Sequence, residues 1–221
     1  MTSVNTYATR AQRSEAHDSL DFFPTPPWAT RALIEHVLVG GGWRKDQLAE
    51  HVCWEPACGA DHMVNPLAEY FAEVIGTDVH DHGPALLHDF LMPFLPPIVK
   101  ARPGPHWIIT NPPFRLGQQF ILRALEIASE GVCMLVRTQF LEGIQRHQEL
   151  FLPHPPLMVA PFVERVPMVK GRLDRGASTA TAYAWLVWAG RRASPKRFST
   201  DTKLRWIPAC RRALERDEDY T

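Results

Sequence analysis

The sequence of 221 residues lacks the features that mark membrane-spanning, secreted and disulfide-stabilised proteins. No window approaches the roughly 20 consecutive apolar residues of a membrane helix. The polar N-terminal segment contains no apolar stretch that could serve as a secretory signal. Only four cysteines are present, without any Cys-x-x-Cys pair, which is typical of a reduced intracellular chain. These absences predict a cytoplasmic protein that does not act at a membrane.

Net charge is also lacking, because 24 Lys and Arg residues balance 24 Asp and Glu residues. The composition therefore gives no sign of a polyanionic partner. Basic residues are nevertheless concentrated in the segment 191–212, which holds eight Lys or Arg residues and one acid, Asp201. This segment could bind phosphates, and it could equally be a solvated surface.

Short apolar runs alternate with segments of helical periodicity between residues 21 and 190. Helices are predicted between the strands, including one that is capped by Thr25 and ends at the glycines 40–42, and another over 62–73. This alternation predicts an α/β fold with a doubly wound, mostly parallel sheet. Residues 1–20 are predicted to be a flexible segment, 21–190 the domain, and 191–221 a basic tail. The seven strands are predicted over 52–55, 74–78, 85–90, 107–110, 131–138, 157–163 and 181–188.

Acidic residues stand at the ends of three predicted strands, namely Glu55, Asp78 and Asp89. In doubly wound sheets the ligand lies beyond the carboxyl ends of the strands. Asp78 follows Gly59 by about 20 residues, the offset at which an acid binds ribose hydroxyls in dinucleotide folds. The chain has no Gly-x-Gly-x-x-Gly loop for a pyrophosphate, so a ribose-bearing cofactor without phosphates, such as S-adenosylmethionine, fits better. Asp89 is then suited to accept a hydrogen bond from an adenine amino group.

The fourth predicted strand runs into Asn111, Pro112, Pro113 and Phe114. An exocyclic amine on a base is a poor nucleophile because its lone pair is conjugated with the ring. The Asn111 side-chain oxygen and the Pro112 carbonyl could accept hydrogen bonds from that amine and make its nitrogen more nucleophilic. Prolines stiffen the loop, and Phe114 offers a face on which an extruded base can stack.

These segments resemble the conserved motifs of amino-methyltransferases with a Rossmann-like class I fold. The order of the motifs is that of the gamma group of adenine-N6 DNA methyltransferases, and the likeness, over roughly residues 20–190, is greatest to small solitary enzymes of phage and prophage type. The matching segments are Phe-x-Thr-Pro (23–26, motif X), WEPACG (54–59, motif I), GTD (76–78, motif II), HDF (88–90, motif III) and NPPF (111–114, motif IV).

The resemblance implies a seven-stranded sheet with one antiparallel strand near the C-terminus, S-adenosylmethionine as cofactor, DNA as substrate and no metal. It also implies a role for each matching position. Around the cofactor, the methionine side is lined by Glu55, Ala57 and Gly59 and covered by Phe23 and Thr25, the ribose is bound by Asp78, and the adenine is bound by Asp89 and Phe90. The target base is held by Asn111, Pro112, Pro113 and Phe114.

Two departures from the family pattern affect these expectations. Motif I has a second glycine where this chain has Asp61, which could cap the next helix or crowd the cofactor and repel its carboxylate. A recognition domain is also missing, so either base contacts would come from loops such as 165–178, or specificity would be low. In that loop Lys170, Arg172 and Arg175 are the candidates for DNA backbone contacts, and a surface loop without that role is the alternative.

Other interpretations remain open at this stage. Guanine-N2 methyltransferases of ribosomal RNA and glutamine methyltransferases of release factors also use Asn-Pro-Pro and an aromatic residue, although the other motifs favour DNA over RNA. A relative impaired by Asp61 could bind nucleic acid without methylating it. His80, His82 and His88 with Asp81 could form a metal cluster, but their spacing matches no established zinc pattern.

Overall fold

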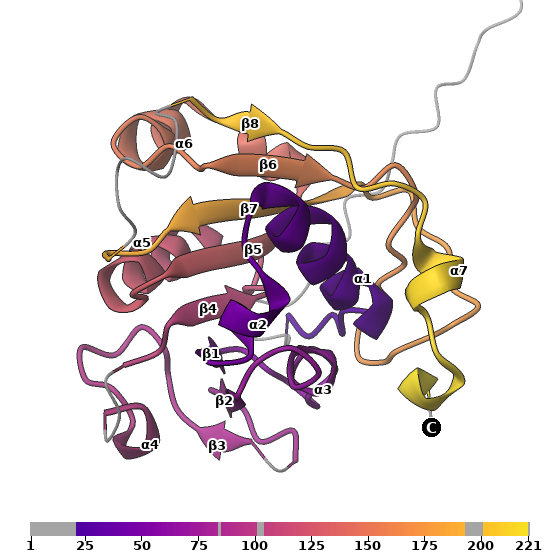
Figure 1. Ribbon diagram of the computed structural model, residues 1–221, viewed down its shortest axis with the longest axis horizontal. Coiled ribbons are helices and arrows are strands. Elements are labelled where there is room, and N and C mark those ends of the chain that lie inside the picture. Colours follow the sequence, from indigo (N-terminus) through magenta and orange to yellow (C-terminus); the bar gives the residue numbers. More distant parts are fainter. Residues whose placement is uncertain (1–20, 84, 101–103, 193–200, 221) are drawn as a thin grey trace, which may run out of the picture.

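The computed structural model describes residues 21–83, 85–100, 104–192 and 201–220. Its centre is an eight-stranded sheet of order β3-β2-β1-β4-β5-β7-β6-β8 (Figure 1). The strands are β1 (Val52–Glu55), β2 (Glu73–Asp78), β3 (Leu86–Leu87), β4 (Trp107–Thr110), β5 (Gly131–Arg137), β6 (Met158–Pro161), β7 (Tyr183–Ala189) and β8 (Lys203–Leu204). The α-helices are α1 (Pro27–Ala32), α2 (Lys45–Leu48), α3 (Val64–Leu67), α4 (Pro97–Lys100), α5 (Gly117–Ile127), α6 (Ile144–Arg146) and α7 (Arg211–Leu214).

The strand directions confirm the predicted fold. Strands β3, β2, β1, β4 and β5 pair in parallel, and β7 lies antiparallel between β5 and β6. A strand occurs at each predicted position, but β3 covers only Leu86–Leu87 rather than 85–90. The two-residue β8 pairs with β6 and makes the sheet eight-stranded rather than seven-stranded. A strand this short has no periodicity to recognise. The helix predicted over 62–73 is wrong in length, since α3 covers only Val64–Leu67.

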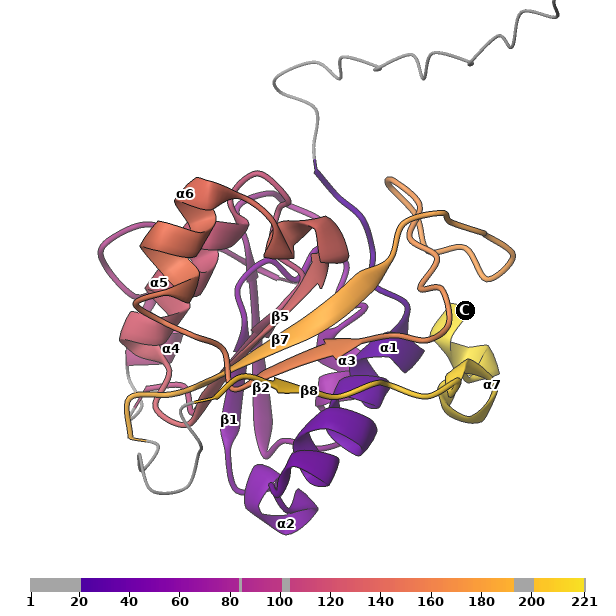
Figure 2. The ribbon, with the colours of Figure 1, turned by 90° about the horizontal axis from the view of Figure 1, so that it is seen from above.

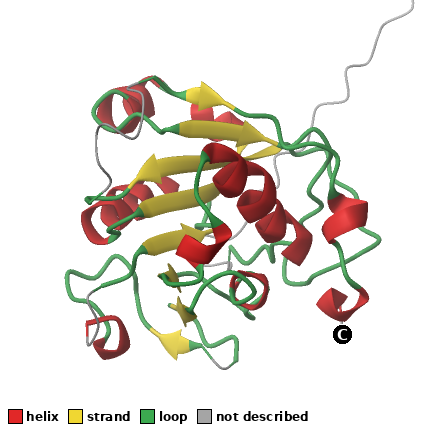
Figure 3. Ribbon diagram, viewed as in Figure 1, coloured by secondary structure: helices red, strands yellow, loops and turns green. Residues whose placement is uncertain are grey.

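The central strands alternate their side chains between two apolar cores, one on each face of the sheet. In β4, Trp107 and Ile109 join the core that contains the residues of α1, whereas Ile108 joins the core that contains those of α5. Figure 2 shows α1, α2 and α3 on one side of the sheet and α4, α5 and α6 on the other, and Figure 3 shows the strands between these helices. Helices on both faces leave the ends of the strands open for a ligand.

The first helix begins at Pro27 and continues through further helical turns to Gly41. Gly42 follows with a φ of 104°, a left-handed conformation that favours glycine. The predicted end of this helix is thus confirmed, but its predicted cap is wrong. Pro26 stands at the N-cap position without a side-chain cap, and the Thr25 hydroxyl is buried without a hydrogen-bond partner among the described residues.

The described part of the C-terminal segment packs along the domain. β8 pairs with β6, while α7 lies near α1 and the loop that precedes β7 (Figure 1). The segment is held by Arg31 of α1, whose side chain forms ion pairs of 2.8 Å with both Asp219 and Glu69. Residues 1–20, Lys196 and Arg197 lie outside the described residues, and the domain boundary at residue 190 stays a prediction. None of the helices described is long and apolar enough to cross a membrane.

Candidate active site

A cavity of about 490 Å³ lies at the carboxyl ends of the parallel strands. Its walls come from the loops that follow β1, β2, β3 and β4 and from the segment that precedes α1. The predicted site residues that line it are Phe23, Thr25, Ala57, Asp78, Asp89, Phe90, Asn111 and Pro113. Four other predicted residues do not line the cavity but are next in the chain to residues that do, namely Glu55 beside Pro56, Gly59 beside Cys58, and Pro112 and Phe114 beside Pro113. The fold therefore brings Asn111 and most of the predicted cofactor residues to one cavity.

The loop after β1 is tied to the end of β2 by backbone hydrogen bonds. The Gly59 amide donates to Asp78 Oδ2 at 2.9 Å, and the His80 amide donates to Asp78 Oδ1 at 2.9 Å. Gly59 has a φ of 54°, and a Cβ there would lie 2.4 Å from the Phe22 ring. A glycine is needed at this position because both the backbone conformation and the packing exclude a side chain.

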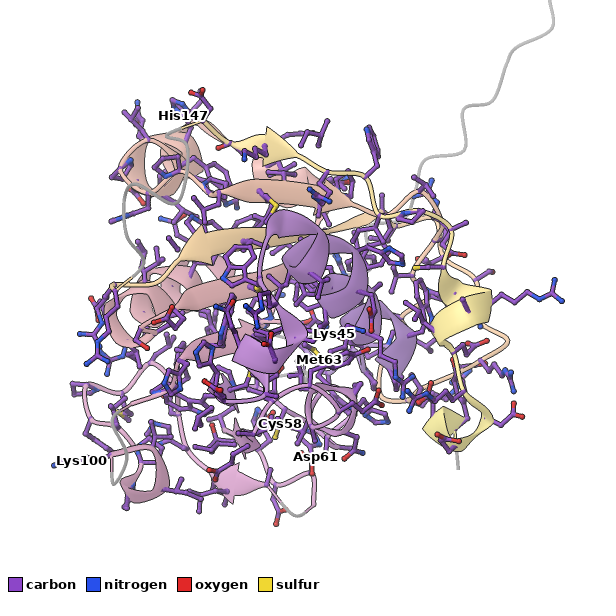
Figure 4. The ribbon with its side chains drawn as sticks, in the orientation of Figure 1. Lys45, Cys58, Asp61, Met63, Lys100 and His147 are labelled. Atoms are coloured by element: carbon purple, nitrogen blue, oxygen red, sulfur yellow. The ribbon has the colours of Figure 1, made fainter. Side chains whose placement is uncertain are left out.

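Asp61 has a left-handed backbone with a φ of 62° (labelled with Cys58 and Met63 in Figure 4). A second glycine would adopt this conformation readily, and aspartate is one of the few other residues that tolerate it. One carboxylate oxygen lies 3.1 Å from the position that a Cβ of Gly76 would occupy, and Asp61 is not among the residues that line the cavity. The carboxylate therefore packs against β2 and does not crowd the cavity.

Glu55, at the end of β1, is fully buried. Its Oε1 accepts a hydrogen bond of 3.0 Å from the Ala57 amide, and the carboxyl also interacts with the Thr110 side chain. Burial, together with the nearby carboxylates of Asp78 and Asp61, raises the pKa of Glu55 to about 8. A positive ligand placed beside this carboxyl would favour its ionised form.

The Asn111 amide is oriented by the chain segment that precedes α1. Its Nδ2 donates a hydrogen bond of 3.0 Å to the Phe23 carbonyl and lies 3.7 Å from the sulfur of Met168. Its Oδ1 is buried without a hydrogen-bond partner from the described residues. Since an unsatisfied buried acceptor is costly, this oxygen is suited to receive a donor from a ligand.

Residues 21–25, which we call the N-terminal strap, connect the loops around the cavity. Asp21 Oδ2 accepts a hydrogen bond of 2.6 Å from the Phe114 amide, and the Phe22 carbonyl accepts one of 2.9 Å from Gly171. The Phe22 ring also stacks on His82, with a distance of 4.5 Å between the ring centroids. Sequence reasoning missed Asp21 and Phe22, for which their proximity to Phe23 was the available signal, and it considered His82 only as part of a possible metal cluster.

Arg137, at the end of β5, was also missed. Its guanidinium carbon lies 3.7 Å from the centroid of the Phe114 ring and 5.8 Å from that of Phe23. Its position was the available signal, because in such sheets the ligand lies beyond the carboxyl ends of the strands, and Arg137 is a polar residue at the carboxyl end of β5. Arg137 therefore belongs to the surroundings of the cavity, next to the loop that carries Asn111.

The basic residues predicted to contact DNA lie in the loop between β6 and β7, which is linked to the strap through Gly171. Arg172 pairs with Asp174 at 3.1 Å, and Arg175 pairs with Asp217 at 2.7 Å. Lys170 is exposed beside them. These pairs involve exposed arginines and are weak in water, so a phosphate could compete for them.

The histidines near the cavity are not arranged as a metal site. His80, His82 and His88 all line the cavity, but within the described ranges no group of three or more His, Cys, Asp or Glu side chains could hold a metal ion. Burial lowers the pKa of His88 and so favours its neutral form. The ring of His82 is engaged by Phe22 instead.

Solved structures with a similar fold include methyltransferase subunits of restriction systems. The methyltransferase subunit of a type I restriction-modification system from Streptococcus thermophilus superposes with a TM-score of 0.56 at 11% identity, over 88% of this chain and 50% of that one. The M protein of the type I restriction enzyme EcoKI superposes with a TM-score of 0.55 at 13% identity, over 91% of this chain and 53% of that one. This chain has the class I methyltransferase fold. It spans about half the length of both methyltransferase structures, and no family model or curated protein matches its sequence.

Proposed function

We propose that this chain transfers a methyl group from S-adenosylmethionine to the exocyclic amino group of a nucleic-acid base, namely N6 of adenine in DNA. The observation that carries the proposal is the Asn111 side chain, whose Nδ2 donates to the Phe23 carbonyl while its Oδ1 is a buried acceptor without a partner among the described residues. This acceptor borders the cavity in which the acids of the strand ends gather. An amine with two N–H donors is the complementary group.

The cavity has the chemical character that the cofactor requires. Asp78 and Asp89 line the cavity and supply acceptors for hydroxyl and amino groups, and Phe90 supplies apolar surface. Glu55 does not line the cavity, but it directly precedes the lining residues Pro56 and Ala57, so its carboxylate would place negative charge behind that wall. Among the described residues, neither Lys nor Arg lines the cavity, which argues against a ligand with phosphates. When bound, S-adenosylmethionine supplies a methyl group that is already activated by the positive sulfur.

The Asn-Pro-Pro-Phe loop provides what the amine needs. Asn111 Oδ1 and the Pro112 carbonyl would accept hydrogen bonds from its two N–H groups, making the nitrogen more tetrahedral and more nucleophilic. Phe114 would stack on the base after it leaves the duplex. No strong base is needed, because the amine loses its proton after attack, and catalysis would rest mainly on positioning.

DNA as the substrate rests on the order of the motifs. Lys170, Arg172 and Arg175 are retained as proposed contacts to the DNA backbone, although Arg172 and Arg175 must exchange carboxylate partners for phosphates. The orientation of Asp61 toward β2 argues against the alternative of a disabled cofactor loop.

The decisive experiment is transfer of a labelled methyl group from S-adenosylmethionine to unmethylated DNA, RNA and protein in parallel, followed by analysis of the product. We expect N6-methyladenine in DNA. Label in guanine of RNA or in glutamine would reject adenine-N6 DNA methylation and support the corresponding acceptor instead. The absence of transfer to all three, with no cofactor binding in calorimetry, would support a relative that does not methylate.

Glu55 gives a pH-dependent prediction for cofactor binding. Its pKa of about 8 lies above its ordinary value of 4.5, so the free protein holds this proton at pH 7. A cationic ligand favours the carboxylate, so binding should release up to one proton and tighten as pH rises, until pH exceeds about 8. Calorimetry in two buffers of different ionisation enthalpy measures this release. Glu55→Gln is the control, and equal proton release by both proteins would contradict the prediction.

A further inference from the structure

Phe114 is fixed from several sides before any ligand is present. Its amide donates to Asp21 at 2.6 Å, and its ring lies 5.1 Å from the Phe23 ring at an angle of 45°. Arg137 contacts the face of the ring, with its guanidinium carbon 3.7 Å from the centroid. A planar guanidinium stacks well on an aromatic face, so this contact restricts the tilt of Phe114.

Arg137 itself is constrained by the sheet. It is the last residue of β5 and pairs directly with Tyr183 of β7, a buried residue. Its Nε is buried without a hydrogen-bond partner in the part of the chain that the structure describes, whereas the side chain also hydrogen-bonds to that of Tyr183. An arginine that leaves a donor unsatisfied yet stacks closely on Phe114 and lies near Phe23 is organised around aromatic contacts rather than around an ion pair.

We infer that Arg137 is a positioning residue for the target base, acting through Phe114; this rests on the proposed function. The guanidinium holds one face of the ring so that the ring presents its other side to the extruded base. A base that stacks on a fixed ring loses less conformational entropy on binding than one that stacks on a mobile ring, because the ring has no motion left to lose. Arg137 then contributes to binding of the base and leaves the chemistry of the amine to Asn111.

The expected effect appears in KM rather than in kcat. Arg137→Met should raise KM for DNA about tenfold and change kcat by less than about twofold, since interactions equal in ground and transition states affect KM alone. Arg137→Lys keeps the charge but loses the planar stack, so it should resemble Arg137→Met. Arg44→Met, at the exposed N-cap position of α2, is the matched control and should behave as wild type. The Kd for S-adenosylmethionine should stay within about twofold in all variants, which excludes general damage to the fold.

A double-mutant cycle with Phe114→Leu tests whether Arg137 acts through Phe114. If it does, Arg137→Met should have little further effect on KM in the Phe114→Leu background, so the two effects will not add. Additive effects would overturn the inference, as would recovery of wild-type KM in Arg137→Lys. The slope of log KM against log salt concentration provides a further test. A slope about one smaller in Arg137→Met than in wild type would also overturn the inference, because it would indicate that Arg137 contacts a phosphate directly. If wild type methylates no base, the proposed function itself fails, which is a different result from wild-type activity with additive variants.

Discussion

Replacement of Asn111 by alanine is expected to lower kcat by a factor on the order of 10²–10³, the usual loss when one preorganised hydrogen-bonding group is removed from a reacting centre. The reason is that Asn111 Oδ1 is the buried acceptor proposed to face the amine. Asn111→Asp keeps an acceptor but loses the Nδ2 donor to the Phe23 carbonyl, so it should lose less activity than alanine. Initial rates of methyl transfer at saturating cofactor provide the measurement.

The control for this prediction is Asn65→Ala, an exposed position in α3. It removes the same side chain away from the cavity and should leave kcat unchanged. The Kd for S-adenosylmethionine should stay within about threefold for Asn111→Ala, since the amide acts on the amine rather than on the cofactor. Retention of more than about a tenth of wild-type kcat by Asn111→Ala would argue against a role in transition-state stabilisation.

The main strands and several cavity residues could be predicted because their signals are local. Apolar runs such as residues 131–137 are long enough to identify a buried strand, and parallel strands bring their carboxyl ends to one edge. Asp78 and Asn111, which stand at those ends, were therefore predictable before their neighbours were known. Their proximity follows from the order of the strands.

The parts that were missed depend on tertiary contacts. Threonine is a common N-cap residue, but the helix begins at Pro27 with Pro26 as its N-cap, which leaves the Thr25 hydroxyl buried. The left-handed conformation of Asp61 could not be predicted from the sequence. Aspartate tolerates that conformation but adopts others more often, so its presence does not indicate it as a glycine would. The contact of Arg137 with Phe114 joins the end of β5 to the loop after β4, and nothing in the spacing of these residues indicates it.

Replacement of Arg31 by methionine should lower the free energy of unfolding by about 3–5 kcal/mol, the usual cost of breaking a buried ion pair on one side. The Arg31 side chain is 4% exposed, and it forms ion pairs with Asp219, also 4% exposed, and with Glu69. It also donates a hydrogen bond of 2.9 Å to the Leu214 carbonyl. Without it, the buried carboxylate of Asp219 loses its ion pair with Arg31, whereas Glu69 keeps one of 2.8 Å with Arg216. Urea unfolding followed by circular dichroism measures the change.

The exposed pair of Arg44 and Asp46, with side chains 70% and 61% exposed, provides the matched control. Arg44→Met should change stability by less than about 1 kcal/mol, because water already screens that pair. If the loss in Arg31→Met arises from unpaired buried charge, neutralising the partners with Glu69→Gln and Asp219→Asn should recover part of it. No recovery would assign the loss to packing of the arginine side chain instead. In both cases a large effect at Arg31 would mean that residues 214–219 are held to the domain as part of its folded structure, since the contacts that break join α1 to that segment.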